Sequence, residues 1–322
     1  MKAIVINQAG GPEQLSFQDV TEPVPADDEI LVDVEAAGIN FIDTYHRIGL
    51  YPLEFPVVPG LEGAGVVRQV GSQVEGIEVG DRVAWAFAMG SYAERIALPA
   101  SAVVPVAEDV ELEIAAAVPL QGATAHYLAI DTFPLAEGDR CLIHAGAGGV
   151  GLLLTQIAKM KGAEVITTAG TAEKAALSRL AGADHTVIYT ETDFKVDIET
   201  RYGPNSIDVV YDGVGAATFE SSLDLLRSRG MMVTYGNASG PVPPVSPLTL
   251  SQKGSLFLTR PTLGSYIATP EELRSRTTDL FDWISNGELN VRIGAEYPLA
   301  QAADAHRALE GRQTTGKVLL SP

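Results

Sequence analysis

A glycine-rich turn constrains this 322-residue chain more than any other feature of its sequence. Residues 144–151 read HAGAGGVG, which places the pattern G-x-G-x-x-G at Gly146, Gly148 and Gly151, between an apolar stretch and an amphipathic one. The first glycine allows a tight turn, the second lets the backbone approach a pyrophosphate, and the third lets the helix pack closely on the strand. The helix start adds backbone N–H groups and the positive end of the helix dipole. We therefore expect a dinucleotide site here rather than a turn that serves packing alone.

The chain beyond residue 120 alternates apolar strands with helical patterns. Helical spacing of apolar residues occurs over 150–158, 171–181 and 217–226. This order is typical of an α/β fold with a doubly wound parallel sheet that helices cover on both faces, the Rossmann arrangement. The expected strands are 141–144, 164–168, 185–189, 207–211, 231–235 and 255–258.

The first 120 residues show a different pattern, with short strands and frequent turn formers. Strands are expected at 3–6, 30–34, 64–70, 82–85 and 92–96. Strands at that spacing, without long helical patterns between them, suggest a partly closed, barrel-like antiparallel domain. The length also favours two domains over one. Near the end of the chain we expect an extended loop, two helices and a closing strand, over 241–247, 271–286, 300–309 and 317–320.

Composition narrows the possible partners and the compartment. The 22 Lys and Arg residues against 41 Asp and Glu residues give a net charge of −19, which repels phosphate backbones and argues against nucleic acid. The single cysteine, Cys141, excludes a disulfide scaffold and is compatible with a reducing cytoplasm. No apolar run is long enough for a bilayer, and the first residues lack a signal-peptide layout. We therefore expect a cytoplasmic protein without a membrane partner.

The end of the second strand favours NADP over NAD. An NAD site places Asp or Glu about twenty residues after the glycines, but residues 167–171 contain no carboxylate. Gly170, Thr171, Lys174 and Tyr189 instead suit a 2′-phosphate. One charge-assisted hydrogen bond is worth about 1.5–3 kcal/mol, roughly ten- to hundredfold in affinity. The negative charge of Glu173, the neighbouring residue, argues against a phosphate here. Alternatively, Lys174 is a solvated surface lysine without a ligand.

The sequence offers no recognisable metal site. The five histidines form no pattern of zinc ligands, and one cysteine cannot build a structural zinc site. His144 is expected to be structural, at the end of the strand before the glycine turn. No Gly-x-Ser-x-Gly elbow and no P-loop lysine is present. Hydride chemistry without a metal remains, in which the cofactor carries the reaction and the protein orients and polarises the reactants.

Four stretches of the sequence are similar to those of a known family. They are 38–45 (GINFIDTY), 60–65 (GLEGAG), 145–151 (AGAGGVG) and 254–263 (GSLFLTRPTL). With these, the chain resembles the zinc-independent NADPH:quinone oxidoreductases, the zeta-crystallin-like group of the medium-chain dehydrogenase/reductase superfamily. Zinc-dependent relatives carry a cysteine where this chain has Asn40 and a His-Glu pair where it has Leu61-Glu62. The four-cysteine lobe of those relatives is absent as well.

The resemblance implies a domain plan and a set of cofactor contacts. Residues 1–120 would form a GroES-like catalytic domain, 121–260 a Rossmann NADPH-binding domain, and 261–322 a return to the catalytic domain. Residues 41–45 would line the nicotinamide and substrate cleft, and Arg312 would reach the 2′-phosphate. The implied NADPH contacts are Phe41, Ile42, Thr44, Tyr127, Gly146, Gly148, Gly149, Val150, Gly151, Gly170, Thr171, Lys174, Tyr189, Gly236, Asn237, Ala238, Ser239, Pro261, Thr262, Leu263 and Arg312.

The implied reaction is hydride transfer from NADPH to a quinone or a related conjugated carbonyl. Negative charge then develops on the acceptor oxygen, where Tyr45, the side-chain amide of Asn40 and Arg260 are candidate donors, and Asp43 is a further catalytic candidate. Water could also protonate the product. A reductase of enones or 2-alkenals, or a non-catalytic NADPH-binding protein, are the alternatives. By analogy with relatives that extend a sheet across a dimer through strand 255–258, we expect a homodimer.

Overall fold

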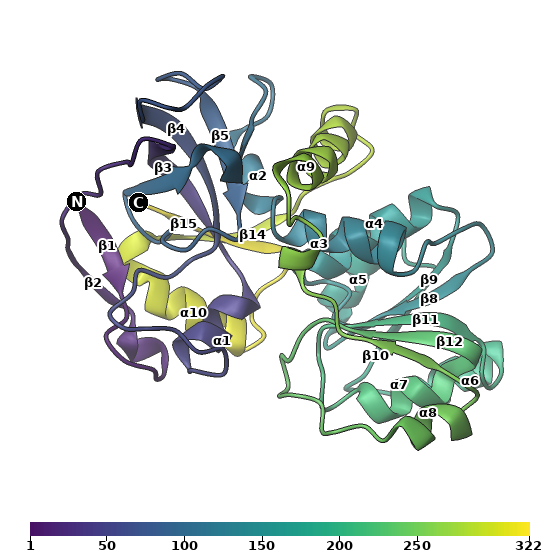
Figure 1. Ribbon diagram of the computed structural model, residues 1–322. Coiled ribbons are helices and arrows are strands. Elements are labelled where there is room, and N and C mark those ends of the chain that lie inside the picture. Colours follow the sequence, from purple (N-terminus) through teal and green to yellow (C-terminus); the bar gives the residue numbers. More distant parts are fainter. The chain divides into compact units, whose positions relative to one another are not determined.

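The computed structural model describes residues 1–322 and divides into two compact units. Unit 1 comprises residues 1–123 and 267–322, and unit 2 comprises residues 124–266 (Figure 1). The C-terminal 56 residues therefore belong to the same unit as the N-terminal ones. None of the helices is long and apolar enough to cross a membrane.

Unit 2 is built on a six-stranded sheet in which every neighbouring pair is parallel. The order is β10-β9-β8-β11-β12-β13, so the winding reverses between β8 and β11, where doubly wound sheets bind their ligands. Strands buried on both faces need continuous apolar residues, and Cys141 to Ile143 are fully buried. The strands are β8 (Arg140–Ile143), β9 (Glu164–Ala169), β10 (His185–Ile188), β11 (Ile207–Asp212), β12 (Leu226–Thr234) and β13 (Phe257–Thr259).

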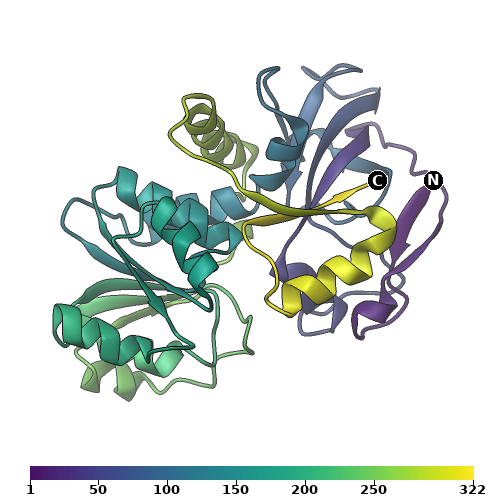
Figure 2. The same ribbon diagram turned by 180° about the vertical axis from the view of Figure 1, so that it is seen from behind.

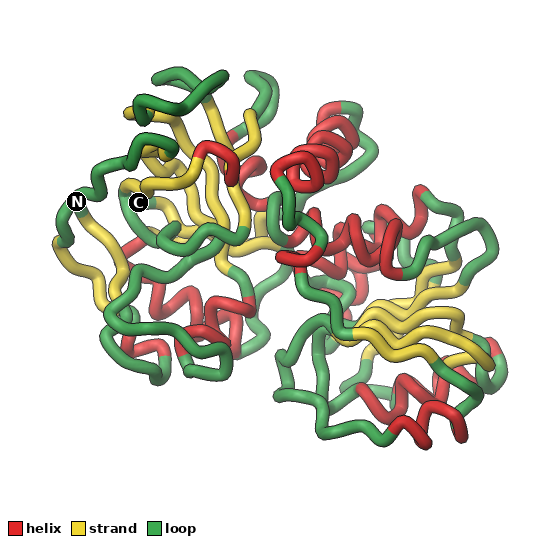
Figure 3. The backbone as a smooth tube through the Cα atoms, viewed as in Figure 1, coloured by secondary structure: helices red, strands yellow, loops and turns green.

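Helices cover both faces of this sheet (Figure 3). In Figure 1, α4 and α5 lie on one face, and α6, α7 and α8 lie on the other. The Rossmann arrangement predicted from the alternating pattern is therefore confirmed. The helical elements are α3 (Gln121–Tyr127), η3 (Leu128–Thr132), α4 (Gly149–Met160), α5 (Ala172–Leu180), α6 (Phe194–Tyr202), α7 (Phe219–Leu225), α8 (Pro247–Gln252) and η4 (Leu263–Ser265), where α3 begins in unit 1.

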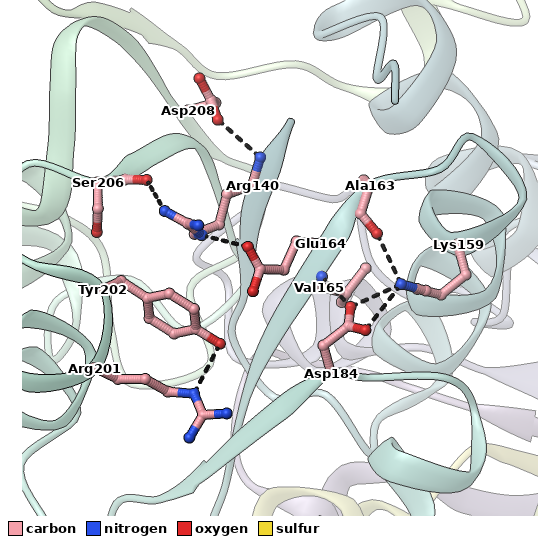
Figure 4. Close-up of polar contacts among 10 residues, drawn as sticks. All are labelled: Arg140, Lys159, Ala163, Glu164, Val165, Asp184, Arg201, Tyr202, Ser206 and Asp208. Atoms are coloured by element: carbon pink, nitrogen blue, oxygen red, sulfur yellow. Dashed lines mark hydrogen bonds and ion pairs between the residues drawn. The ribbon is translucent and has the colours of Figure 1, made fainter. Parts of the chain in front are cut away.

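The amino edge of this sheet is held by ion pairs and hydrogen bonds (Figure 4). Arg140, the first residue of β8, pairs with Glu164, the first residue of β9, at 2.7 Å. Asp184 accepts from Lys159 at 2.8 Å and from the backbone N–H of Val165. These polar groups stabilise the amino edge of the sheet. The loops that follow the strands lie at the opposite, carboxyl edge.

Unit 1 contains a seven-stranded sheet and a separate pair, β1 with β2. The path is β14-β15-β3-β4-β5-β7, with β6 paired to β3. Its core surrounds Trp85, which is fully buried and donates to Ser91 Oγ at 2.9 Å. The strands are β1 (Lys2–Val5), β2 (Ser16–Asp19), β3 (Glu29–Ile39), β4 (Glu62–Val70), β5 (Arg82–Ala86), β6 (Arg95–Pro99), β7 (Val103–Pro105), β14 (Ile293–Pro298) and β15 (Lys317–Ser321).

The C-terminal segment adds one parallel pair to this otherwise antiparallel sheet. β14 and β15 are parallel because a helix connects them, as parallel neighbours require. β15 then pairs antiparallel with β3, and so joins the end of the chain to its beginning. Figure 2 shows the yellow C-terminal helix and strands within the same unit as the purple N-terminal strands. Within residues 1–120 every strand pair is antiparallel, as the sequence predicted, and the parallel pair comes from the C-terminal segment.

The helices of unit 1 are short apart from α9. Their sequences give little periodic signal: α1 has seven residues, and α2 reads LEIAAA. Neither helix could accordingly be predicted from the sequence, although both are present. The elements are η1 (Pro12–Gln14), α1 (Phe41–Arg47), η2 (Ala100–Ala102), α2 (Leu112–Ala117), α9 (Pro270–Ser285), η5 (Leu299–Gln301) and α10 (Ala302–Glu310).

Candidate functional site

The glycine turn of unit 2 connects β8 to α4 at the point where the strand order reverses. A Cβ on Gly146 would lie 2.6 Å from the Thr167 side chain, and one on Gly151 would lie 2.4 Å from the Ala145 carbonyl oxygen. A Cβ on Gly148 would meet only that same oxygen, at 3.2 Å. Gly146 and Gly151 are thus required by internal packing, whereas Gly148 keeps the surface open, which is what close approach of a pyrophosphate needs.

The α4 helix begins at this open position. Gly148 is its N-cap, no acidic residue occurs in its first turn, and Gly148, Gly149 and Val150 are half-buried. The first N–H groups of a twelve-residue helix have no partner within the helix and carry the positive end of its dipole. This end of α4 therefore fits an anionic diphosphate.

His144 supports the turn from inside. The ring is fully buried, and burial lowers its pKa, so it is neutral. Ser222 donates its hydroxyl hydrogen to the Thr218 carbonyl oxygen, so Ser222 Oγ accepts from His144 Nε2 at 2.9 Å. Nδ1 is then the acceptor and receives the Thr168 hydroxyl at 3.0 Å. The structural role predicted for His144 is confirmed, since the ring joins the ends of β8 and β9 to α7.

A buried carboxylate at the end of β11 was not predicted from the sequence. Asp212 is fully buried and accepts the backbone N–H groups of Val214 and Gly215 at 2.7 and 3.1 Å and the Thr218 hydroxyl at 2.8 Å. It thereby shapes the loop beside the switch point. A strand followed by Asp-Gly-x-Gly was the available signal, because this pattern favours a turn stabilised by its own aspartate.

The loop 236–240 lies against the same Asp212 loop. Ala238 and Ser239 donate their backbone N–H groups to Gly213 and Val214, and Ser239 Oγ accepts from the Ala217 N–H at 3.0 Å. Arg260 donates to the Thr234 carbonyl oxygen at 3.1 Å. After it, Pro261 and Leu263 are buried while Thr262 is exposed. The residues expected around the nicotinamide half thus follow β12 and β13 at the carboxyl edge of the sheet.

The residues expected around the adenosine end follow β9 and β10 at the same edge. A Cβ on Gly170 would lie 2.6 Å from the Tyr189 hydroxyl, so that ring packs on the glycine. Thr171 is the N-cap of α5 and accepts from the Lys174 backbone N–H. Its hydroxyl bonds the Glu173 carboxylate and holds the pKa of that carboxyl below its usual value. Glu173 is therefore ionised close to the position where a 2′-phosphate is expected.

Of the other expected contacts, Tyr127 belongs to unit 2 but not to this sheet edge, and Phe41, Ile42, Thr44 and Arg312 belong to unit 1. Tyr127, at the end of α3, is buried and stacks on Tyr266, with ring centroids 4.1 Å apart and planes 8° apart. Arg312 belongs to unit 1, where it is exposed and follows α10. The remaining expected contacts of unit 2 are therefore the ones that a single sheet edge brings together.

In unit 1 the candidate segment 40–45 forms the cap and first turns of α1. The backbone N–H of Asn40 donates to Asp43 Oδ2 at 2.8 Å, which completes a capping box. The amide nitrogen of Asn40 donates to Glu62 Oε2 at 2.9 Å and to the Gly38 carbonyl oxygen at 3.3 Å. Both amide hydrogens are thus engaged within the protein, and the residue is 3% exposed. Asn40 consequently orients this segment from within.

A buried ion pair between Glu62 and Lys317 holds Asn40 in turn. The two side chains are 0% and 1% exposed, and Lys317 Nζ also donates to Asn40 Oδ1 at 3.0 Å. Burial lowers the pKa of Lys317 from its ordinary value, while Glu62 opposes that shift. A Cβ on Gly38 would lie 2.5 Å from both side chains, so only glycine fits beside the pair. Neither partner was predicted from the sequence to belong to the site.

These residues do not fit a zinc ion. Asn40 and Leu61 are not zinc ligands of the usual kind, and the carboxylate of Glu62 is already neutralised by the Lys317 ammonium. No group of three or more His, Cys, Asp or Glu side chains comes together in a way that could hold a metal.

Tyr45 of the same segment packs among aromatic rings. Tyr45 is 7% exposed, with its ring edge-on to Tyr51 at 5.4 Å and tilted toward Phe41 at 6.3 Å. Thr44 is buried and donates to the Phe41 carbonyl oxygen at 2.7 Å, and Ile42 is half-buried. The partly exposed residues of the segment, Phe41 and Ile42, are thus apolar, and the Tyr45 phenol is buried beside them.

Comparisons with known proteins agree with this arrangement. Residues 26–108 match the model of the alcohol dehydrogenase GroES-like domain, and residues 149–285 match that of the zinc-binding dehydrogenase. A quinone oxidoreductase of Pseudomonas aeruginosa is 44% identical over 100% of this chain and 99% of its own. A 2-haloacrylate reductase of a Burkholderia species is 39% identical over 99% and 98%. A crystal structure of Escherichia coli quinone oxidoreductase complexed with NADPH has a TM-score of 0.98 at 43% identity and covers 100% of both chains.

The parallel sheet with its glycine turn and the GroES-like unit together define a dinucleotide-binding oxidoreductase of two units. With full-length relatives at this level of identity, the chain belongs to the quinone oxidoreductases of the medium-chain dehydrogenase/reductase superfamily.

Proposed function

We propose that this protein is an NADPH:quinone oxidoreductase that works without zinc. The observation that carries the proposal is the open glycine turn at the start of α4, placed where the sheet reverses its winding. Relatives named quinone oxidoreductase match the whole chain, and two similar structures were solved with NADPH. When bound, NADPH supplies the hydride from its nicotinamide C4. The chain's own residues hold the cofactor and stabilise the charge that develops on the acceptor.

The direct test is NADPH consumption against a small panel of quinones and enones, repeated with NADH. We expect quinone-dependent oxidation with NADPH and weaker activity with NADH. The 2-haloacrylate reductase among the relatives favours reduction of conjugated carbonyls as the second candidate function. It predicts higher kcat/KM for enones than for quinones in the same panel. NADPH binding without acceptor-dependent oxidation would instead indicate a non-catalytic role.

Lys174 is proposed to bind the 2′-phosphate, together with Tyr189 and the N-cap of α5. Replacing Lys174 by Glu should weaken NADPH binding by about ten- to hundredfold, because a charge-assisted hydrogen bond is lost, and leave NADH binding nearly unchanged. The measurement is the Kd of both nucleotides by fluorescence titration. Lys161→Glu makes the same charge change at the far end of α4 and should affect neither nucleotide. Equal losses for both nucleotides would contradict the assignment.

Independence from zinc is supported by the side chains at the positions where zinc-dependent relatives carry ligands. Asn40 and Leu61 offer no zinc ligand, and the carboxylate of Glu62 already forms an ion pair with the Lys317 ammonium. Turnover should therefore be insensitive to a strong chelator. Loss of activity on chelation, restored by zinc, would overturn this part of the proposal.

On the acceptor side we propose Tyr45 as a donor to the developing oxyanion, with Asn40 orienting the segment. If Tyr45 donates a proton or hydrogen bond, Tyr45→Phe should lower kcat by about a hundredfold while the Kd of NADPH is unchanged. Tyr51→Phe, which alters the neighbouring ring, is the matched control. An unchanged kcat in Tyr45→Phe would mean that Tyr45 only packs in the site and that water protonates the product.

We also infer a cytoplasmic homodimer. The single cysteine, Cys141, is fully buried and free, which is compatible with a reducing compartment. β13 is an edge strand of the unit 2 sheet, with Phe257 56% exposed and Leu248 of α8 62% exposed nearby in sequence. Edge strands are ready templates for pairing with a second chain. Sedimentation of the protein should give twice the 34.0 kDa of one chain.

A further inference from the structure

A chain of buried polar side chains adjoins segment 40–45 in unit 1. Its members are Arg47, His306, Tyr92 and Asp43, each no more than 1% exposed. They come from α1, from α10 and from the connection between β5 and β6, and the hydrogen-bonded pair Arg47 and His306 is 259 positions apart in the sequence. Buried polar groups of this kind are tolerated only when hydrogen bonds satisfy them.

The hydrogen bonds among these four side chains all donate in one direction, from Arg47 toward Asp43. Arg47 Nη1 lies 3.0 Å from His306 Nδ1, and because a guanidinium only donates, the ring hydrogen must be on Nε2. Nε2 donates to Tyr92 Oη at 3.2 Å, and Tyr92 Oη donates to Asp43 Oδ2 at 2.8 Å. Burial and the nearby Arg47 lower the pKa of His306 to about 3, so the ring is neutral. The chain therefore ends on the Asp43 carboxyl.

Asp43 is the member whose charge can change near neutral pH. Burial raises the pKa of Asp43 to about 7, against the donors from Asn40 and Tyr92 that favour the carboxylate. One carboxyl oxygen, Oδ1, is buried without any hydrogen-bond partner, so the carboxylate is only half satisfied. Removing one of its two donors should therefore favour the protonated form further.

The other ionisable groups around Asp43 keep their charges paired. Lys317 of β15 and Glu62 of β4 form the buried ion pair described above. Arg47 pairs with Glu310 of α10 at 2.7 Å. Burial and the neighbouring Asp43 raise the pKa of Tyr92 well above its usual value, so Tyr92 stays protonated. Asp43 is thus the group of this cluster that titrates in the neutral range.

We propose that Tyr92 and His306 are positioning residues for the reaction: they hold the Asp43 carboxyl within the first turn of α1 and determine whether it carries charge there. The proposal rests on the proposed function. Hydride transfer places negative charge on the acceptor, and a second negative charge buried in the adjoining segment opposes it, whereas a protonated carboxyl does not. Turnover is therefore faster when Asp43 is protonated.

The test is the pH dependence of kcat for NADPH and a soluble benzoquinone. The wild-type kcat should fall as pH rises through about 7, so that kcat at about pH 8 is roughly a tenth of its value at low pH. Tyr92→Phe should move this fall to higher pH by about one unit, because the carboxylate loses a donor. A Tyr92→Phe profile that superimposes on that of the wild type would overturn the proposal.

Two further variants make the experiment decisive. Asp43→Asn cannot ionise and should lose the fall in kcat between about pH 6 and pH 8 altogether. Tyr211→Phe removes the hydroxyl of another fully buried tyrosine, in unit 2, and should keep the wild-type profile. If Asp43→Asn retains the same ionisation, a different group controls turnover and the proposal fails.

A second readout separates this proposal from the proposed function. The infrared band of a protonated carboxyl should be present in the free wild-type protein below about pH 7, absent in Asp43→Asn, and retained to higher pH in Tyr92→Phe. If no quinone is reduced but the band behaves in this way, the proposed function is wrong while the buried chain still sets the charge of Asp43. If quinones are reduced and the band is unaffected by Tyr92→Phe, the inference itself is wrong.

Discussion

Replacing Lys317 by Met should lower the free energy of unfolding of unit 1 by about 3–5 kcal/mol, because Glu62 is left as an unpaired buried charge. The pair is 1% and 0% exposed, so solvent cannot compensate. Only the Asn40 amide and the Leu120 backbone N–H would remain as donors to the carboxylate. Both tryptophans, Trp85 and Trp283, lie in unit 1, so their fluorescence during urea denaturation reports this unit directly.

The double variant Lys317→Met with Glu62→Gln tests the cause of that loss. With both charges removed, most of the lost stability should return, since replacing a buried ion pair by neutral groups is often neutral or stabilising. Lys2→Met, which breaks a pair with Asp19 exposed by 41% and 78%, is the control and should cost less than about 1 kcal/mol. If Lys317→Met is as stable as the wild type, Glu62 is not left as an unpaired buried charge and the prediction is wrong.

The second large effect concerns the dependence of stability on pH. His306 has a pKa of about 3 in the folded protein, below its ordinary 6.5. As pH falls below 6.5, the unfolded chain binds a proton that the folded chain does not, so stability declines by about 1.4 kcal/mol per pH unit toward pH 3. The contribution of His306 therefore increases with pH across this window.

Asp43 acts with the opposite sign. Its pKa rises from 3.8 to about 7 on folding, so the folded chain holds a proton between these values that the unfolded chain has released. Stability from Asp43 is greatest at low pH and declines by about 1.4 kcal/mol per unit as pH rises toward 7. Between about pH 4 and pH 6.5 the two contributions largely cancel in the wild type.

Single variants should expose each half of this balance. Relative to the wild type, His306→Gln should lose stability as pH rises from about 4 to 6.5, and Asp43→Asn should gain it, by up to about 3 kcal/mol in each case. The measurement is the urea midpoint, followed by tryptophan fluorescence at several pH values. Slopes that stay parallel to the wild type in both variants would show that neither group changes its protonation on folding.

The glycine turn and the parallel sheet of unit 2 could be predicted from the sequence because their signals are local. Strand, glycines, helix and next strand follow one another along the chain, and the packing reasons for Gly146 and Gly151 act over short distances. The carboxyl ends of parallel strands then meet at one edge, which brings the expected cofactor contacts of unit 2 together. Contacts between distant residues could not be predicted in this way. The side-chain amide of Asn40 was expected to donate to the acceptor oxygen, but its hydrogens are bonded to Gly38 and Glu62.

Residue types in short patterns were enough to predict the nucleotide-binding α/β unit, and the same kind of pattern led to the proposals of a 2′-phosphate contact at Lys174 and of independence from zinc. The contact of Glu62 with Lys317 across 255 positions, and those of Tyr92 with His306 and Asp43 across 214 and 49, could be seen only in the folded chain. Such pairs leave no periodic trace in the chain, because a buried charge is stabilised by whichever partner folding brings within hydrogen-bond distance.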